Sequence, residues 1–465
     1  DYFTAVGSKV FFRSEDGVNG RTMWVTDGTV AGTLKMNNFP WAESLVAGAT
    51  KLFYRSYDAT NGWELWVSDG TPAGTRLTKD LNNSSGDTWM DSFTTSGDQL
   101  YFRANNGVTG YEFATSDGTE VGTFMLGDFN TTGDSWPDYL VPIGNGKLLF
   151  RVDDGTVPTH RNLWVSDGTI AGTQAITSSY VGANVAGAWS ASPENILYLP
   201  STGKAYFRGW DITNGFELWS TDGTVAGTQL FKNLNPNGDS NANTMTVVGD
   251  RMMFRAADGV RGEEPWITDG TAAGTIALGD LNTVGASSDP NGMTKTTNRM
   301  FFSADDGNHG RELWVKDSNG TRMVADKNPF GYGSPEYITA IGDNVVYRYN
   351  DGVNGNELWF SDGTANGTIR LTNAVTNGDS NPDSVTSFGN KAMFRMYDPT
   401  NGWEPWITDG TLGGTTLLKD IRGYGDSYPS AFTMVGAKMF FVADDGVSGS
   451  QLWVTDGTTN GTIAL

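Results

Sequence analysis

Short apolar runs, bounded by glycine, asparagine and aspartate, recur along the whole chain. One set occupies residues 431–436, 438–442, 451–455 and 462–465. Short runs rich in aromatic and β-branched side chains are typical of strands, and no run has the period of a helix. We therefore predict an all-β chain built from four-stranded antiparallel units, whose strands we call A to D in chain order.

The middle strands of each unit are apolar at consecutive positions, as residues 52–54 and 65–67 show. Such strands need both faces of their sheet covered. Sheets that cover one another occur in β-propellers and in stacked solenoids, and four strands in about 47 residues favour a propeller. Strand A has the smaller residues, as residues 92–97 show, so we expect it to be the inner strand.

The unit occurs ten times, with 42 to 55 residues between equivalent positions. A repeat of this size buries its apolar surface only against its neighbours. We predict a single domain, residues 1–465, in which ten blades form one ring. Two five-bladed rings or an open array are the alternatives, because propellers usually have four to eight blades. The units cover about residues 1–38, 39–82, 83–130, 131–178, 179–235, 236–282, 283–328, 329–373, 374–420 and 421–465.

Nine units carry the sequence Asp-Gly-Thr between strands C and D. Aspartate can accept hydrogen bonds from amides two residues further on, and glycine allows the positive φ of a tight turn. We predict that these aspartates stabilise turns. They are Asp27, Asp69, Asp117, Asp167, Asp222, Asp269, Asp362, Asp409 and Asp456.

Six units place an arginine of strand B nine residues before a glutamate of strand C. If Arg55 lies opposite Glu64, then Phe53 lies opposite Trp66 on the same face of the sheet. We predict cross-strand salt bridges at these positions, with ligand binding by the arginines as the alternative. The pairs are Arg55–Glu64, Arg103–Glu112, Arg208–Glu217, Arg255–Glu264, Arg348–Glu357 and Arg395–Glu404.

Residues 64–71 read Glu-Leu-Trp-Val-Ser-Asp-Gly-Thr, and the copies of this sequence resemble the bacterial repeat family named for its Glu-Leu-Trp-x-x-Asp-Gly-Thr motif. The resemblance covers essentially the whole chain, although Ala114 replaces tryptophan in the third unit. It implies a large secreted or surface protein of an environmental bacterium, with a propeller architecture and no defined activity. The turn also resembles the Asp-box of sialidases, but its spacing differs, so no sialidase residue is assigned.

The charge of the chain narrows its partners and its location. There are 53 acidic and 31 basic residues, giving a formal net charge of −22, so we do not expect nucleic acid or anionic membranes as partners. No apolar run approaches the ~20 residues of a membrane-spanning helix. The chain has no cysteine, which is compatible with the cytosol and with bacterial secretion. Because it begins in mid-repeat, we expect a processed or excised segment of an extracellular or cell-surface protein.

Acidic residues gather in the connection from strand D to the next strand A. Carboxylate and asparagine oxygens within seven residues suit a hard cation, so we predict calcium sites there. Turns and strand caps use the same residue types and are the alternative. The candidate ligands are Asp80, Asn82, Asp87, Asp128, Asn130, Asp134, Asp420 and Asp426.

Two tryptophans outside the repeat position, Trp89 and Trp136, lie beside these acidic connections. Aromatic rings beside carboxylates are suited to sugars, which makes both residues candidate ligand contacts, while packing between blades is the alternative. Residues 177–193 replace the usual connection with a longer one, which we interpret as an irregular insertion, with a ligand loop as the alternative.

The sequence offers little for catalysis. His160 and His309 are the only histidines, and their spacing fits neither a zinc site nor a Ser-His-Asp triad. We therefore expect a non-enzymatic extracellular structural, adhesion or interaction module that binds other proteins or glycans. The alternative is a carbohydrate-binding lectin or a polysaccharide-acting enzyme with its site on the face of the acidic loops.

Overall fold

The computed structural model describes residues 3–15, 18, 20–36, 41–82, 86–155, 161–177, 194–284, 286–329, 331–376, 378–423 and 425–465. In these ranges the chain forms ten four-stranded antiparallel sheets and no helix. This is the all-β, ten-bladed β-propeller class predicted from the sequence. The predicted insertion at residues 177–193 lies outside the described residues except for Thr177. No helix of sufficient length and apolarity to span a membrane occurs in the described ranges.

The chain divides into two compact units, Asp1–Asp250 and Arg251–Leu465, which we describe separately. The strands of the first unit are β1 (Thr4–Val6), β2 (Lys9–Glu15), β3 (Arg21–Thr26), β4 (Leu34–Lys35), β5 (Glu43–Ala47), β6 (Leu52–Asp58), β7 (Gly62–Ser68), β8 (Arg76–Lys79), β9 (Trp89–Ser96), β10 (Gln99–Asn105), β11 (Tyr111–Ser116), β12 (Phe124–Met125), β13 (Asp138–Pro142), β14 (Leu148–Val152), β15 (Asn162–Ser166), β16 (Gln174–Ala175), β17 (Glu194–Leu199), β18 (Lys204–Asp211), β19 (Gly215–Thr221), β20 (Gln229–Lys232) and β21 (Asn243–Val248).

The strands of the second unit are β22 (Arg251–Ala257), β23 (Glu263–Thr268), β24 (Ile276–Ala277), β25 (Asn291–Lys295), β26 (Met300–Asp305), β27 (Arg311–Asp317), β28 (Gly320–Ala325), β29 (Glu336–Ile341), β30 (Asn344–Asn350), β31 (Asn356–Ser361), β32 (Ile369–Arg370), β33 (Asp383–Phe388), β34 (Lys391–Asp398), β35 (Gly402–Thr408), β36 (Thr416–Leu417), β37 (Ser430–Val435), β38 (Lys438–Asp444), β39 (Ser450–Thr455) and β40 (Ile463–Ala464).

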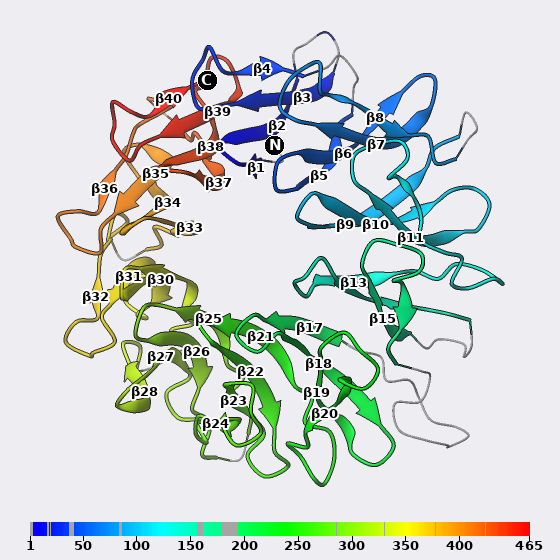
Figure 1. Cartoon of the computed structure of the whole chain (residues 1–465). Helices are drawn as coiled ribbons and strands as arrows, with labels where there is room; N and C mark the ends of the chain where they lie inside the picture. The colour runs from blue at the N-terminus through cyan, green and yellow to red at the C-terminus, as the bar shows by residue number, and fades with distance from the viewer. Residues whose placement is uncertain are drawn as a thin grey trace. The chain divides into compact units, whose positions relative to one another are not determined.

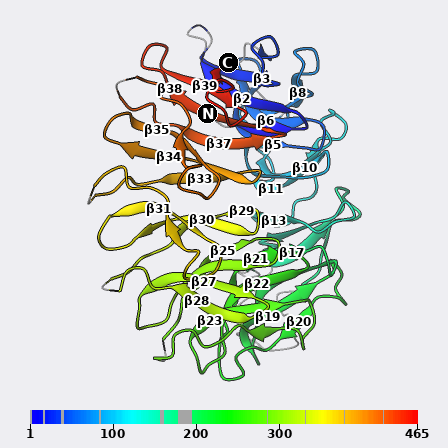
Figure 2. The same cartoon turned by 90° about the vertical axis from the view of Figure 1, so that its left-hand side faces the viewer.

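Each sheet is a meander in which the strands follow one another in chain order, and we number the blades 1 to 10 from β1–β4 onward. Within the first unit the first strands β1, β5, β9, β13 and β17 lie side by side (Figure 1). The first strands β25, β29, β33 and β37 do the same in the second unit, whose blades follow one another as successive layers in Figure 2. Strand A is therefore the inner strand, as predicted from its smaller residues.

The hydrophobic cores lie between neighbouring blades. Phe11 and Met23 of blade 1, for example, form one buried cluster with Leu52, Tyr54 and Trp66 of blade 2. Similar clusters join blades 2 and 3, and blades 8 and 9. Burying one such side chain stabilises the fold by about 1.5–3 kcal/mol. The apolar residues of blade 2, for example, thus pack against a neighbouring blade on both faces of the sheet.

A β-bulge interrupts most inner strands. Glu43 pairs with Arg55 and Val46 pairs with Phe53, so the register of β5 against β6 shifts between these pairs. Ser44 inside the bulge has a positive φ of 53°, and the equivalent Ser92, Thr244 and Ser384 share this conformation. A bulge bends the strand and redirects the side chains beside it. Here it separates the apolar half of the inner strand from its polar beginning.

The predicted pairing of strands B and C is wrong by one residue. Arg55 lies opposite Leu65, Ser56 lies opposite Glu64, and Tyr54, not Phe53, lies opposite Trp66. Arg55 and Glu64 consequently point to opposite faces of the sheet, because neighbouring residues of a strand alternate between its faces. The same register applies to the pairs containing Arg103, Arg208, Arg255, Arg348 and Arg395. The predicted arginine–glutamate salt bridges do not form.

Candidate functional site

The glutamate of the repeat motif fastens the connection between blades. Glu64 in β7 is fully buried, and its carboxylate accepts hydrogen bonds from Thr88 Oγ1 (2.6 Å), the Thr88 amide (3.2 Å) and the Leu81 amide (3.3 Å). Burial raises the pKa of Glu64 to about 7, and the nearby negative charge of Asp80 also raises it. Equivalent buried carboxylates are Glu112, Glu217, Glu264, Glu312, Glu357 and Glu404.

Leu81 and Thr88 flank the acidic connection that we predicted to bind calcium. Its last aspartate, Asp87, accepts a hydrogen bond of 3.0 Å from the Trp63 amide, and Asn82 donates to the Asp87 carbonyl. Asp134 and Asn130 make the equivalent bonds, with the Tyr111 amide as donor to Asp134. The structure therefore brings these predicted residues together around backbone groups.

Three of the remaining calcium candidates, Asp80, Asp128 and Asp420, begin their connections, whereas Asp426 ends one at the position equivalent to Asp87 and Asp134. Asp426 accepts a hydrogen bond from the Trp403 amide at 2.9 Å, and Asp420 accepts one from the Gly423 amide at 2.7 Å. Burial is the main cause that raises the pKa values of Glu112 and Glu404. The nearby negative charges of Asp128 and Asp420, respectively, raise them further. In the described ranges no group of three or more histidine, cysteine, aspartate or glutamate side chains is arranged to hold a metal ion. Calcium binding stays a prediction.

The Asp-Gly-Thr turns are built as predicted. Asp69 Oδ1 accepts hydrogen bonds from the Thr71 amide (2.9 Å) and hydroxyl (2.7 Å), and Gly70 has a φ of 81°. The bond from the Thr71 hydroxyl is the main cause that lowers the pKa of Asp69. The second glycine of the motif, Gly74, packs directly on this carboxylate, so a Cβ there would overlap it. This contact explains why glycine stands three residues after the motif threonine Thr71.

Five arginines of strand B pair with an acidic residue of the inner strand of their own blade. Arg103 contacts Asp91 at 2.5 Å, and Arg395 holds Asp383 through two hydrogen bonds of 2.5 and 2.9 Å. Arg151 pairs with Asp138, Arg208 with Glu194 and Arg348 with Glu336. The acidic residue lies 12 to 14 positions before the arginine, a spacing that could have indicated the pairs.

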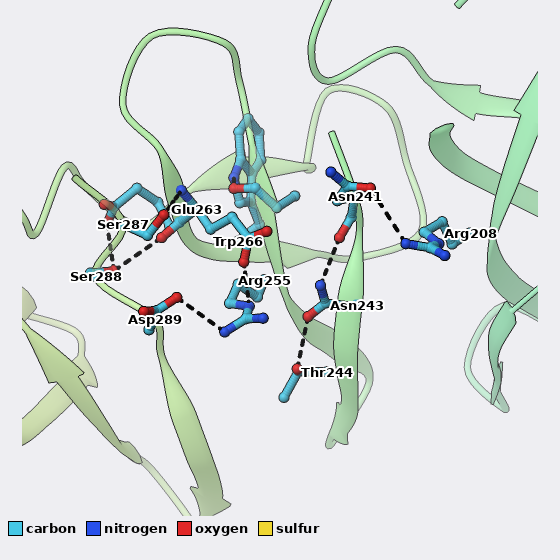
Figure 3. Close-up of polar contacts among 12 residues, drawn as sticks. Arg208, Asn241, Asn243, Thr244, Arg255, Glu263, Trp266, Ser287, Ser288 and Asp289 are labelled. Carbon is cyan, nitrogen blue, oxygen red and sulfur yellow. Dashed lines mark hydrogen bonds and ion pairs between the residues drawn. The ribbon is translucent and has the colours of Figure 1, made fainter. Parts of the chain in front are cut away.

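Two arginines of strand B, Arg208 and Arg255, also reach the start of the next inner strand. Figure 3 shows Arg208 donating to Asn241 (3.4 Å) in the first unit and Arg255 donating to Asp289 (3.2 Å) in the second. Arg255 additionally pairs with Glu263 at 2.8 Å. Asn241 and Asp289 occupy equivalent positions, two residues before the first residue of β21 and β25. The arginine therefore links two blades at this position.

The two candidate ligand tryptophans lie at this same linking position. The Arg103 guanidinium lies 5.0 Å from the Trp136 ring, which stacks on Tyr111 at 4.6 Å. The Arg55 guanidinium lies 5.6 Å from the Trp89 ring. Trp89 is 56% exposed and Trp136 is 38% exposed. Both rings thus rest on an arginine and keep one part open to solvent.

Other blades carry exposed aromatic residues at the equivalent position. Trp41 of blade 2 is 53% exposed and Tyr428 of blade 10 is 55% exposed. We call Trp41, Trp89, Trp136 and Tyr428 the aromatic positions. Each stands at, or two residues before, the first residue of an inner strand. Buried glutamates fasten the connections beside Trp89, Trp136 and Tyr428, whereas blade 1, which precedes Trp41, has Thr22 at the position of the motif glutamate. Sequence analysis singled out Trp89 and Trp136 and missed Trp41 and Tyr428, which precede strand A at the same spacing.

Of the two histidines, the structure describes His309. His309 is exposed and its Nδ1 lies 2.7 Å from Asp306 Oδ2, and this contact raises the pKa of His309. His160 lies outside the described residues.

Comparisons with known proteins find similar solved structures at low sequence identity. No family model and no curated protein matches the chain. Among solved structures it is similar to puromycin hydrolase, at 12% identity and a TM-score of 0.34, over 78% of this chain and 59% of that chain. A mutant of that enzyme complexed with PGG gives 12% identity and a TM-score of 0.35, over 75% and 58%. A prolyl endopeptidase gives 10% identity and 0.36, over 86% and 54%. The chain therefore spans less than two thirds of the length of these proteins.

Proposed function

We propose that the chain is a non-enzymatic interaction module of an extracellular or cell-surface bacterial protein, with a structural or adhesive role. The aromatic positions are the surface that would contact its partners. Aromatic residues and arginine are enriched at binding interfaces, where they form the anchors. The calcium sites remain part of the proposal as supports of the adjoining connections.

The backbone at the aromatic positions carries this proposal. Trp41, Trp136 and Tyr428 have positive φ values of 71°, 46° and 46°. The equivalent Asn241 and Asp289 share this conformation, which Asn and Asp adopt readily. A left-handed conformation costs other residues roughly 1–2 kcal/mol, so a large aromatic ring is a poor choice for the turn itself. Its presence on an exposed rim is explained by a partner that the ring contacts.

The remaining motif residues support a structural role for the repeat. The motif aspartates accept hydrogen bonds within the turns, and the motif glutamates accept hydrogen bonds from the connections between blades. The same bonds recur in successive blades. A catalytic site needs groups whose surroundings differ from those of their copies, because general acid and base must have different pKa values. Because the repeated aspartates and glutamates have equal surroundings in successive blades, they are suited to stabilising the fold rather than to catalysis.

A second candidate function is carbohydrate binding, which Trp89 and Trp136 favour. Both rings are partly exposed, lie within about 6 Å of an arginine guanidinium and have carboxylates within the adjoining connection. A sugar can stack its apolar face on an indole and donate hydroxyl hydrogen bonds to carboxylates.

An array of glycans and extracellular proteins, probed with the labelled chain with and without calcium, tests both candidates. Binding to a defined set of glycans supports the carbohydrate function, and capture of extracellular proteins without glycan binding supports the broader interaction module. Incubation of the same polysaccharides and of peptides with the chain serves as the turnover control. Release of products at a rate proportional to chain concentration would contradict the non-enzymatic assignment.

A further inference from the structure

Arg55 differs from the equivalent arginines in its partners. Its guanidinium lies 4.4 Å from the Trp63 ring and 5.6 Å from the Trp89 ring. Within the described residues it makes no ion pair and no hydrogen bond, and its Nε is buried without a partner. A guanidinium has five N–H donors, and leaving them unused near the surface is costly unless water or a ligand accepts them.

Blade 9 has the same arrangement of aromatic rings beside an arginine, but there the arginine makes an ion pair. Tyr397 and Trp403 lie 6.1 Å apart, as Tyr57 and Trp63 do at 6.0 Å in blade 2. There Arg395 lies 5.5 Å from Trp403 and holds Asp383 through two hydrogen bonds. Blades 2 and 9 thus share their aromatic pair and differ in the carboxylate.

Glu43, the acidic residue that could form an ion pair with Arg55, lies closer to another arginine. Glu43 lies opposite Arg55 in the β-ladder, as Asp383 lies opposite Arg395. Its carboxylate instead lies 4.0 Å from Arg13 of blade 1, and its side chain is 40% exposed. Arg55 therefore keeps its positive charge uncompensated by an ion pair in a chain whose formal net charge is −22.

We infer that Arg55, Trp63 and Trp89 form a subsite for one acidic sugar residue of a glycan, a uronate whose carboxylate is bound by the Arg55 guanidinium. This inference rests on the proposed interaction function and names its ligand. Planar guanidinium and carboxylate groups form two parallel hydrogen bonds, which give both affinity and orientation. The exposed Trp89 ring stacks on the apolar face of the same sugar.

The charge of the chain restricts the glycan further. A densely charged polyanion would meet repulsion from the acidic surface, whereas a single carboxylate is affected mainly by charges within the ~8 Å Debye length at physiological salt. The subsite thus favours a glycan in which uronate residues are separated by neutral sugars.

Titration calorimetry with two matched disaccharides tests the inference. The probe is β-glucuronosyl-(1→4)-glucose, and cellobiose is its neutral counterpart, with a hydroxymethyl group in place of the carboxylate. We expect the acidic disaccharide to bind at least about tenfold more tightly than cellobiose. This factor is roughly what one hydrogen bond to a charged group contributes, and cellobiose cannot make that bond.

Variants locate the binding. Arg55→Gln and Trp89→Ala should each weaken binding of the acidic disaccharide at least about tenfold, which corresponds to 1.4 kcal/mol or more. Arg395→Gln is the matched control in blade 9 and should leave binding unchanged. Trp89 is exposed, so Trp89→Ala keeps the test valid if Arg55→Gln proves unstable.

Three results would overturn the inference: equal binding of both disaccharides, binding that Arg55→Gln and Trp89→Ala leave intact, or no binding of the acidic disaccharide. In the first case a neutral sugar is bound and the carbohydrate function survives. In the third, binding of other glycans or proteins on the array would show that the interaction function holds without this subsite.

Discussion

The hydroxyl of Tyr349 donates a hydrogen bond of 2.6 Å to Glu312 Oε2, and so joins blade 8 to the buried carboxylate of blade 7. Both side chains are almost fully buried. Burial raises the pKa of Glu312 to about 8, while the bond from Tyr349 lowers it. Glu312 therefore stabilises the connection that follows its own blade and also accepts a hydrogen bond from the next blade.

Replacing Tyr349 by phenylalanine tests that contact. Tyr349→Phe removes one donor to a buried carboxylate and should lower the free energy of unfolding by about 1.5–3 kcal/mol. Tyr347→Phe is the matched control, since Tyr347 is equally buried and its hydroxyl makes no hydrogen bond within the described residues. Denaturation midpoints in urea measure both. Equal losses in the two variants would show that the hydrogen bond contributes nothing specific.

The buried glutamates predict an unusual pH dependence of stability. The pKa values of Glu64, Glu112 and Glu404 are raised to about 7 in the folded chain, from an ordinary value of 4.5. Between these values the folded state binds more protons than the unfolded state, so the free energy of unfolding falls as pH rises from about 4.5 to about 7. We expect the melting temperature to be at least about 2 °C higher at pH 5 than at pH 8.

The turn aspartates limit this gain at low pH. The pKa of Asp69 is lowered from 3.8, mainly by the Thr71 hydroxyl, so its stabilisation is complete above pH ~4 and is lost as pH falls through its folded pKa. The melting temperature should therefore pass through a maximum near pH 5. A Glu404→Gln variant should show a smaller rise between pH 8 and pH 5. A melting temperature that increases from pH 5 to pH 8 would contradict the assignment of raised pKa values.

Two adjacent glycines test the turn geometry. Gly414 packs on the Asp409 carboxylate, whereas a Cβ at Gly413 would meet nothing within 4 Å. Gly414→Ala should displace Asp409 from its bonds with Thr411 and cost about 1–3 kcal/mol. Gly413→Ala should change the free energy of unfolding by less than about 1 kcal/mol. Thermal melting of the two variants measures the difference. Equal changes in stability would show that contact with the Asp409 carboxylate is not the reason for glycine at position 414.

The turns could be predicted from the sequence because they are local. Asp69 bonds to a residue two positions on, so one motif contains the whole arrangement. The strand register could not, because it depends on the number of residues in the hairpin. Asp58 pairs with Gly62 across three loop residues, and an odd loop places residues nine apart on opposite faces. The contact of Trp89 with Arg55 joins two blades and follows from their packing.

Calcium binding remains to be tested by melting the chain in calcium, in magnesium and in chelator at constant ionic strength. An ion that binds the folded form alone at a hundredfold excess over its Kd adds about 2.7 kcal/mol. Asp128→Asn should reduce the rise in melting temperature with calcium if the connection holding Asp128 and Asp134 binds an ion. The same melting temperature in all three solutions would show that these carboxylates serve the backbone amides they contact.

The central claim is that the motif residues hold the blades while the aromatic positions bind the partner. The most direct measurement compares the wild-type chain with the triple variant Trp41→Ala, Trp89→Ala, Trp136→Ala on the same glycan and protein array. We expect the variant to lose its array signals by at least about tenfold while its melting temperature stays within about 3 °C of wild type. Undiminished array signals from a folded triple variant would contradict the account.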